Sequence, residues 1–176
     1  RVTNGIDPFG FTKEGGGTLV LSGSNSYSGV TTVNNGMITL SHGSALGRTN
    51  GNTVINGPSG GCVQLSGNLV VAEPLVLNGE RVNPYATGGL WALYSSGSNT
   101  LSGPLVRQGG QTRIQIANGS WLVARGGVTG GNGQCVLTVS ASTGGIAFYD
   151  NPVNIGIHTL YFEMASSGLA AIGVAG

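Results

Sequence analysis

Carboxylates are the side chains in this sequence best suited to acid–base chemistry, and they are few and dispersed. Glycoside hydrolysis uses two carboxyl groups that flank one bond, and calcium is held by several oxygen ligands gathered in one place. No two of the acids are adjacent or one residue apart. We therefore predict that the protein is not an enzyme; an enzyme acting on polysaccharides is the less favoured alternative. The acids are Asp7, Glu14, Glu73, Glu80, Asp150 and Glu163.

A second candidate for chemistry is Ser59, because GPSGG at residues 57–61 matches the G-x-S-x-G pattern of hydrolase nucleophiles. That pattern works only on a strand-to-helix elbow, and no helical period follows it here. Its base would have to be His42 or His158, both distant in sequence. A glycine-rich corner is the favoured interpretation. C-x-x-C, H-E-x-x-H and Walker patterns are absent, so we expect no metal and no cofactor.

The composition is that of a turn-rich β protein. Gly accounts for 34 of the 176 residues, and charged residues make up 7%, against averages of about 7% for Gly and about 25% for charged residues. A hydrophobic fraction of 39% excludes a disordered polar chain. The seven basic residues are scattered and the net charge is +1, which predicts no nucleic-acid partner because such binding needs a dense basic patch. No apolar run reaches the roughly 18 residues of a membrane span.

Short segments with period-two alternation recur along the chain and predict β-strands with little or no helix. Gly, Asn and Ser separate these segments and supply turns. Either an antiparallel sandwich or barrel or a parallel β-solenoid could follow from this pattern. The clearest alternating segments are 18–22, 37–40, 62–66 and 112–116.

Three observations favour the solenoid. Few loops have the two-residue form of a hairpin turn. Asn is frequent near the expected corners, for example Asn34, Asn56 and Asn78, where stacked amides can bond along a ladder. The motif LSG-N recurs at 21–25 and 65–68, which indicates stacking of equivalent units.

The length of a coil then fixes two further expectations. At roughly 20–25 residues per coil, the chain forms about seven to eight coils in a single domain. Cys62 and Cys135 are 73 residues apart, about three coils or ~14 Å along the axis. A disulfide needs Cα atoms within about 7 Å, so we predict two free thiols.

Residues 12–40, TKEGGGTLVLSGSNSYSGVTTVNNGMITL, resemble the autotransporter-associated β-strand repeat, also called the passenger-associated transport repeat. Its pattern is roughly T-K-x-G-x-G-T-L-x-L-S-G-x-N-x-Y-x-G-x-T-T-V-x-x-G-x-L-x-L. Glu14 and Met37 depart from it, since small or neutral residues are more common at both positions. The matching residues are Thr12, Lys13, Gly15, Gly17, Thr18, Leu19, Leu21, Ser22, Gly23, Asn25, Tyr27, Gly29, Thr31, Thr32, Val33, Gly36 and Leu40.

The resemblance implies a right-handed parallel β-helix in the passenger of a secreted bacterial protein displayed at the cell surface. It also implies a role in carrying that passenger rather than a chemical activity. Residues 62–128 resemble the Gly/Asn-rich coils that follow such repeats, and the last forty residues have no strong match. We expect 1–176 to be one solenoid domain in which 41–176 forms further Gly/Asn-rich coils. We further expect the chain to be a fragment or repeat unit of a longer protein.

The favoured function is therefore a structural segment of a bacterial cell-surface or extracellular fibre-forming protein. Neither end of the expected solenoid has a capping helix, and the C-terminal segment ends in apolar residues. Another coil could therefore pair with either end, and we expect self-association through the ends. A module that binds glycans or host surfaces is the alternative. Its binding face would use Trp91, Tyr94 and Trp121, although isolated aromatics that fill the core are the competing interpretation.

Overall fold

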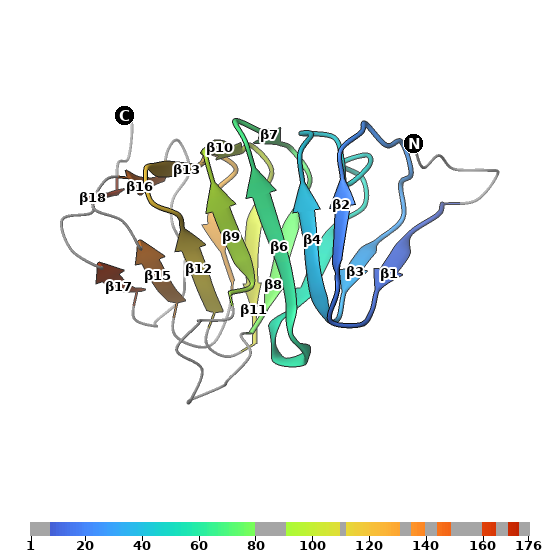
Figure 1. The fold of residues 1–176 in the computed structure, drawn as a ribbon, viewed down its shortest axis with the longest axis horizontal. Helices are drawn as coiled ribbons and strands as arrows, with labels where there is room; N and C mark the ends of the chain where they lie inside the picture. Colours follow the sequence, from blue (N-terminus) through green and yellow to red (C-terminus); the bar gives the residue numbers. More distant parts are fainter. Residues whose placement is uncertain are drawn as a thin grey trace.

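The computed structural model describes residues 8–79, 91–109, 112–130, 135–139, 144–148, 160–164 and 169–172. Its strands stack into a parallel β-solenoid with three sheets (Figure 1). Every strand pairing in these ranges is parallel. The all-β parallel solenoid predicted from the sequence is therefore confirmed, and the antiparallel sandwich is excluded.

Each sheet takes one strand from successive coils. In spatial order, the first sheet contains β1 (Phe11–Lys13), β3 (Thr31–Val33), β5 (Thr53–Asn56), β8 (Leu75–Asn78), β11 (Leu105–Gln108) and β14 (Val128–Thr129). The second sheet contains β2 (Thr18–Leu21), β4 (Gly36–Leu40), β6 (Gly61–Ser66), β9 (Leu93–Ser96), β12 (Thr112–Ile116), β15 (Cys135–Val139) and β17 (Leu160–Met164). The third sheet contains β7 (Val70–Val71), β10 (Ser98–Leu101), β13 (Ser120–Ala124), β16 (Gly144–Phe148) and β18 (Leu169–Ile172).

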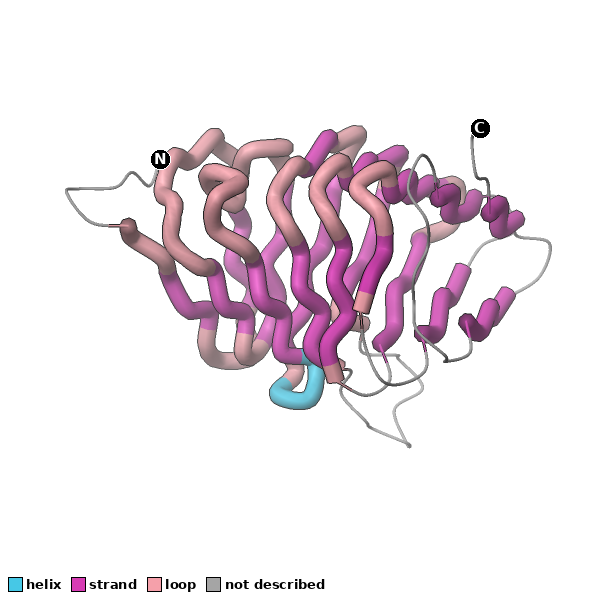
Figure 2. The backbone as a smooth tube through the Cα atoms, turned by 180° about the vertical axis from the view of Figure 1, so that it is seen from behind, coloured by secondary structure: helices cyan, strands magenta, loops and turns pink. Residues whose placement is uncertain are grey.

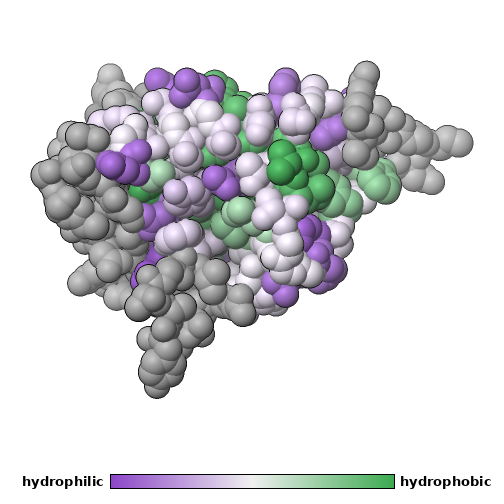
Figure 3. All heavy atoms as spheres, viewed as in Figure 1, coloured by the Kyte–Doolittle hydropathy of each residue, from purple (hydrophilic) through white to green (hydrophobic). Residues whose placement is uncertain are grey.

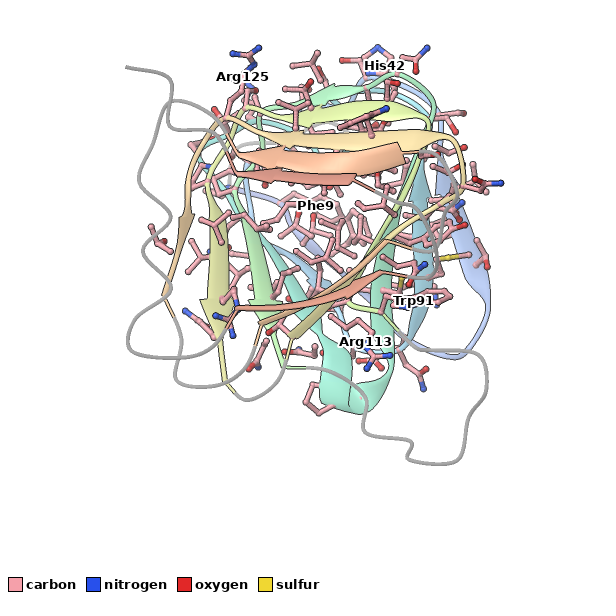
Figure 4. The ribbon with its side chains drawn as sticks, turned by 90° about the vertical axis from the view of Figure 1, so that its left-hand side faces the viewer. Phe9, His42, Trp91, Arg113 and Arg125 are labelled. Carbon is pink, nitrogen blue, oxygen red and sulfur yellow. The ribbon has the colours of Figure 1, made fainter. Side chains whose placement is uncertain are left out.

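The core is built from columns of apolar side chains, one from each coil. Alternation along a strand sends every second side chain inward, and parallel in-register pairing places equivalent inward residues above one another. In the second sheet, Ile38 pairs with Val63, Val63 with Leu93, and Leu93 with Ile114, and all four are buried. Seen along the solenoid, such side chains fill the space that the three sheets enclose (Figure 4).

Among the described residues, about five turns of the solenoid have a strand in the third sheet, whereas the second sheet takes one strand from each of seven coils, against the seven to eight coils predicted from the sequence. The two counts differ because the third sheet begins only at β7, and loops close that side of the first two coils (Figure 2). The coils also differ in length. Thr53 pairs with Leu75, which is 22 residues later, whereas Leu75 pairs with Leu105, which is 30 residues later.

An asparagine ladder joins the coils at the corner that follows the first sheet. Nδ2 of Asn78 donates to Oδ1 of Asn56 at 2.9 Å, and Nδ2 of Asn56 donates to Oδ1 of Asn34 at 2.7 Å. Nδ2 of Asn34 donates in turn to Oε1 of Glu14 at 2.5 Å. The amide stacking expected at these three Asn residues is confirmed, and Glu14 is the acceptor at the N-terminal end of the ladder.

The cysteines occupy strands that are far apart in the second sheet. Cys62 lies on β6 and Cys135 on β15, and β9 and β12 lie between these strands. Three strand spacings amount to ~14 Å, which is too far for a disulfide within the chain. Cys62 is a free thiol, as predicted, and burial raises its pKa to about 12. The side chain of Cys135 lies outside the described residues.

The ladder predicts a specific loss of stability on changing its middle member. Asn56→Ala removes one donor and one acceptor, which leaves the amides of Asn34 and Asn78 without these partners. We expect the free energy of unfolding to fall by about 1–3 kcal/mol, the cost of leaving a partly buried polar group unsatisfied. Urea unfolding followed by circular dichroism measures this change. Asn50→Ala, in an exposed turn, is the control, and an equal effect of both substitutions would contradict a role for the ladder.

Candidate functional site

The corner between β1 and β2 is closed by Lys13. Its Nζ donates to the carbonyl oxygens of Glu14 at 2.7 Å, Gly15 at 2.6 Å and Asn35 at 3.0 Å. Asn35 belongs to the next coil, so the ammonium group ties two successive corners together. Gly36 lies directly below with φ of 73°, and a Cβ there would collide with the carbonyl oxygens of Gly15 and Gly17. The lysine and the glycines of residues 12–36 therefore form one compact corner.

A second corner, at residues 22–30, is organised by Asn25 and Tyr27. Nδ2 of Asn25 donates to the carbonyl oxygen of Ala45 at 2.7 Å, and the backbone nitrogen of Arg48 donates to the carbonyl oxygen of Tyr27 at 2.8 Å. Both bonds reach the loop of the following coil. They hold the two loops together on the side of the solenoid where these coils have no strand in the third sheet. A side-chain bond and a backbone bond thus join these two coils where a β-ladder joins the later coils.

The buried Tyr27 is also the centre of an aromatic and hydroxyl cluster. Its ring meets the edges of Phe9 and Phe11, with centroid distances of 6.4 and 5.5 Å. Its hydroxyl lies 2.7 Å from Oγ1 of Thr31. Burial is the main reason that the pKa of Tyr27 rises to about 12; the hydrogen bond to Thr31 lowers it, and the nearby Glu73 carboxylate raises it.

Lys13, Asn25 and Tyr27, which make these contacts, are positions of the sequence pattern of residues 12–40. A comparison with protein families identifies the same segment. The family model of the passenger-associated transport repeat matches residues 11–40. The chain carries a passenger-associated transport repeat. No curated protein and no solved structure matched the chain.

The passenger-associated transport repeat comprises β1 to β4 and the corners between them. Together with the parallel solenoid, it fits a segment of an autotransporter passenger, and it implies a secreted or cell-surface protein. It also suggests a structural region of the passenger rather than an enzyme. No helix among the described residues is long and apolar enough to cross a membrane.

The structure places the repeat residues predicted from the sequence on strands of the first and second sheets and at the corners between these strands. Leu21, Val33 and Leu40 point into the core, with Leu21 only partly buried at the end of the solenoid. Thr31 points inward and bonds to Tyr27, whereas Thr32 lies between inward residues and is only partly buried. Gly29 permits close stacking, because a Cβ there would lie 2.6 Å from the backbone of Gly10.

The residues considered for catalysis do not come together in the described part of the chain. Glu14 is exposed at the corner after β1, whereas Glu73 is buried at the corner before β8. Ser59 is exposed in a single-turn 3-10 helix, η1 (Gly57–Ser59), which leads into β6 rather than into an α-helix. Nδ1 of His42 accepts a hydrogen bond from the backbone of Ser44 at 3.0 Å. Among the described side chains, no three His, Cys, Asp or Glu residues group as metal ligands.

The other candidates fall where side chains are not described. Asp7, Glu80, Asp150 and His158 lie outside the described residues, and of Glu163 only the backbone, within β17, is described.

The three aromatic residues proposed for a binding face divide between two sheets. Trp91 and Tyr94 stack, with a centroid distance of 5.2 Å and an interplanar angle of 27°. Tyr94 belongs to β9 of the second sheet, whereas Trp121 belongs to β13 of the third. A binding face on the second sheet can therefore use Trp91 and Tyr94 but not Trp121.

Glu73 is the unusual residue that sequence reasoning missed. It is 3% exposed, and neither of its carboxylate oxygens has a hydrogen-bond partner among the described residues. Burial raises its pKa to about 7. The available signal was its position in VVAEPLVL, between two apolar segments, because a corner only three residues long between buried strands leaves its side chain little access to water.

The buried carboxyl group makes stability depend on pH. Its pKa is 4.5 when unperturbed and about 7 in the folded protein, so between these values the folded state holds a proton that the unfolded state has lost. The free energy of unfolding should therefore fall as pH rises from about 4.5 to 7 and then level off, by about 3 kcal/mol in total.

Glu73→Gln should remove most of this dependence and should stabilise the protein at neutral pH but not at pH 4. Unfolding in urea at a series of pH values measures both effects. An identical pH profile in the variant and the wild type would show that Glu73 is not the titrating group.

Proposed function

We propose that this protein is a structural stalk segment of an autotransporter passenger, secreted to the bacterial surface, whose N-terminal end pairs with another parallel coil. The passenger-associated transport repeat at 11–40 and the parallel solenoid support the stalk. A solenoid suits this role because each coil bonds only to its neighbours, so a chain that emerges from one end can fold progressively.

The observation that carries the pairing is the exposure of core-facing groups at the N-terminal end. β1 and β2 are the outermost described strands of the first and second sheets. Leu19 on β2 pairs with the buried Ile38, so it faces the core, yet it is 36% exposed. Phe9 is 46% exposed and lies over the enclosed core when the solenoid is viewed along its axis (Figure 4).

The polar groups at the N-terminal end also favour pairing with another parallel coil. An outermost strand offers backbone groups to an incoming strand, and the ladder ends here on the carboxylate of Glu14 rather than on an amide. A carboxylate oxygen accepts strong hydrogen bonds. The best occupant is therefore a parallel coil that places apolar side chains over Leu19 and a donor, such as an Asn amide, over Glu14. A second copy of this chain can supply that coil.

The pairing is tested with two substitutions on the same strand. Leu19→Lys places a charge on the core-facing side of β2, whereas Val20→Lys places it on the outward side, where Val20 is 58% exposed. We expect the wild type and Val20→Lys to form thin rods longer than one solenoid in electron micrographs and to sediment as oligomers. Leu19→Lys should remain monomeric with an unchanged circular dichroism spectrum. A wild-type protein that is monomeric at all concentrations would overturn the pairing.

The location is tested separately. The full chain is expressed ahead of an outer-membrane translocator domain, and protease is added to intact cells. We expect the protease to remove the chain from the cell surface. Retention of the folded chain inside the cell would contradict a passenger role whatever the result for end pairing.

A further inference from the structure

The outer face of the second sheet carries an aromatic platform at its centre. Tyr94 is on β9 and partly exposed, and the ring of Trp91, just before the strand, stacks on it at 5.2 Å. Trp91 lies at the rim of the solenoid in the axial view (Figure 4). Stacked aromatic rings form a rigid apolar surface whose edges carry the indole N–H and the phenol hydroxyl. Such a surface is typical of binding sites. The two rings lie outside the apolar core on the other side of the sheet.

Polar side chains flank the platform at fixed spacing. Parallel register aligns Thr39, Gln64, Tyr94 and Gln115 across four neighbouring strands. We call this set the Tyr94 row. Neighbours in the row are about 4.8 Å apart. The partly exposed Gln64 stands on one side of Tyr94, whereas Gln115 on the other side is 2% exposed and its Nε2 donates to the carbonyl oxygen of Ile116 at 3.4 Å. Oγ1 of Thr39 donates to Oε1 of Gln64 at 3.3 Å, which leaves the amide nitrogen of Gln64 directed to other acceptors.

The same face is almost uncharged. It is the front surface in Figure 3, where pale and moderately polar residues surround an apolar cluster over β2 and β4. Among the described outward residues of β2, β4, β6, β9 and β12, Arg113 is the one charged side chain. A surface with rings, amides and hydroxyls but little charge does not suit nucleic acid or an anionic membrane. It suits a neutral ligand that has both apolar C–H faces and hydroxyl groups.

We propose that Trp91, Tyr94 and Gln64 bind a saccharide, namely a flat β-1,4-linked chain of equatorially substituted pyranoses. Such sugars present axial C–H groups that pack on aromatic rings, and their equatorial hydroxyls lie at the ring edge, where the amide of Gln64 is placed. An extended ribbon of this kind can follow the row across neighbouring strands, whereas a helical α-1,4-linked glucan cannot. This site lies on the side of the solenoid, so it is independent of pairing at the end.

Tryptophan fluorescence can report on binding, because the sequence contains two Trp residues and only Trp91 is on the proposed site. In a Trp121→Phe variant the fluorescence comes from Trp91 alone. We expect soluble cello- or chito-oligosaccharides to change that fluorescence saturably and malto-oligosaccharides to leave it unchanged. In the reciprocal Trp91→Phe variant, where Trp121 is the reporter, none of these sugars should change the signal.

Calorimetric titration with the same sugars then tests the individual residues. Trp91→Ala and Tyr94→Ala should each weaken binding by about two- to tenfold, the size expected when an aromatic stacking partner is lost. Tyr94→Phe should retain most of the affinity because it keeps the ring. Trp121→Ala is the matched control and should bind as the wild type does. Thermal unfolding of each variant shows whether the solenoid remains folded.

Three results would overturn the proposal. They are no binding of any β-1,4-linked sugar to the wild type, full binding by folded Trp91→Ala and Tyr94→Ala variants, or equal loss of binding on Trp121→Ala. None of these results bears on end pairing, since Leu19 and Glu14 are not part of the site.

Discussion

In-register parallel pairing between successive coils is the constraint on which the rest of this structure depends. It stacks Ile38, Val63, Leu93 and Ile114 into one apolar column and, at the corner, aligns three amides closely enough to bond. A shift of one residue in any strand would turn its core side chains outward. The corner residues resist such shifts, because Gly36 fits under the preceding corner only without a Cβ. Backbone, core and corner thus specify the same register.

The passenger-associated transport repeat can be understood as the device that establishes this register in the first two coils. Those coils lack a strand in the third sheet. On that side the bonds from Asn25 to Ala45 and from Arg48 to Tyr27 join the two coils, and at the opposite corner Lys13 bonds to Asn35 of the next coil. Glu73 has the opposite effect, since a buried carboxyl group with a raised pKa weakens the fold at neutral pH. The outer faces are free of these demands, so aromatic and amide side chains can collect there for binding.

Local patterns predicted much of this fold, and long-range packing explains what they missed. Alternation in TLVL and GCVQLS predicted β2 and β6, because alternate residues of each strand face the core, although that face is buried in β6 and partly exposed in the outermost strand β2. Asn residues at equivalent corners of successive coils predicted the ladder, because amides stacked at one coil spacing can bond to one another. Coil length was not predictable, since a loop can replace a strand on one side, as at 22–30. The separation of Trp121 from Trp91 was also hidden, because it depends on which sheet each segment joins.

Disulfide formation between paired cysteines tests the central register most directly. Thr12, Thr32 and Val54 are successive register partners in the first sheet and alternate with its inward residues. In a background without Cys62 and Cys135, the pairs Thr12→Cys/Thr32→Cys and Thr32→Cys/Val54→Cys should each oxidise to a disulfide, because partners on neighbouring strands lie about 5 Å apart. Thr12→Cys/Val54→Cys, two strands apart, should not. Failure of both neighbouring pairs, or equal cross-linking of the third, would contradict parallel in-register stacking.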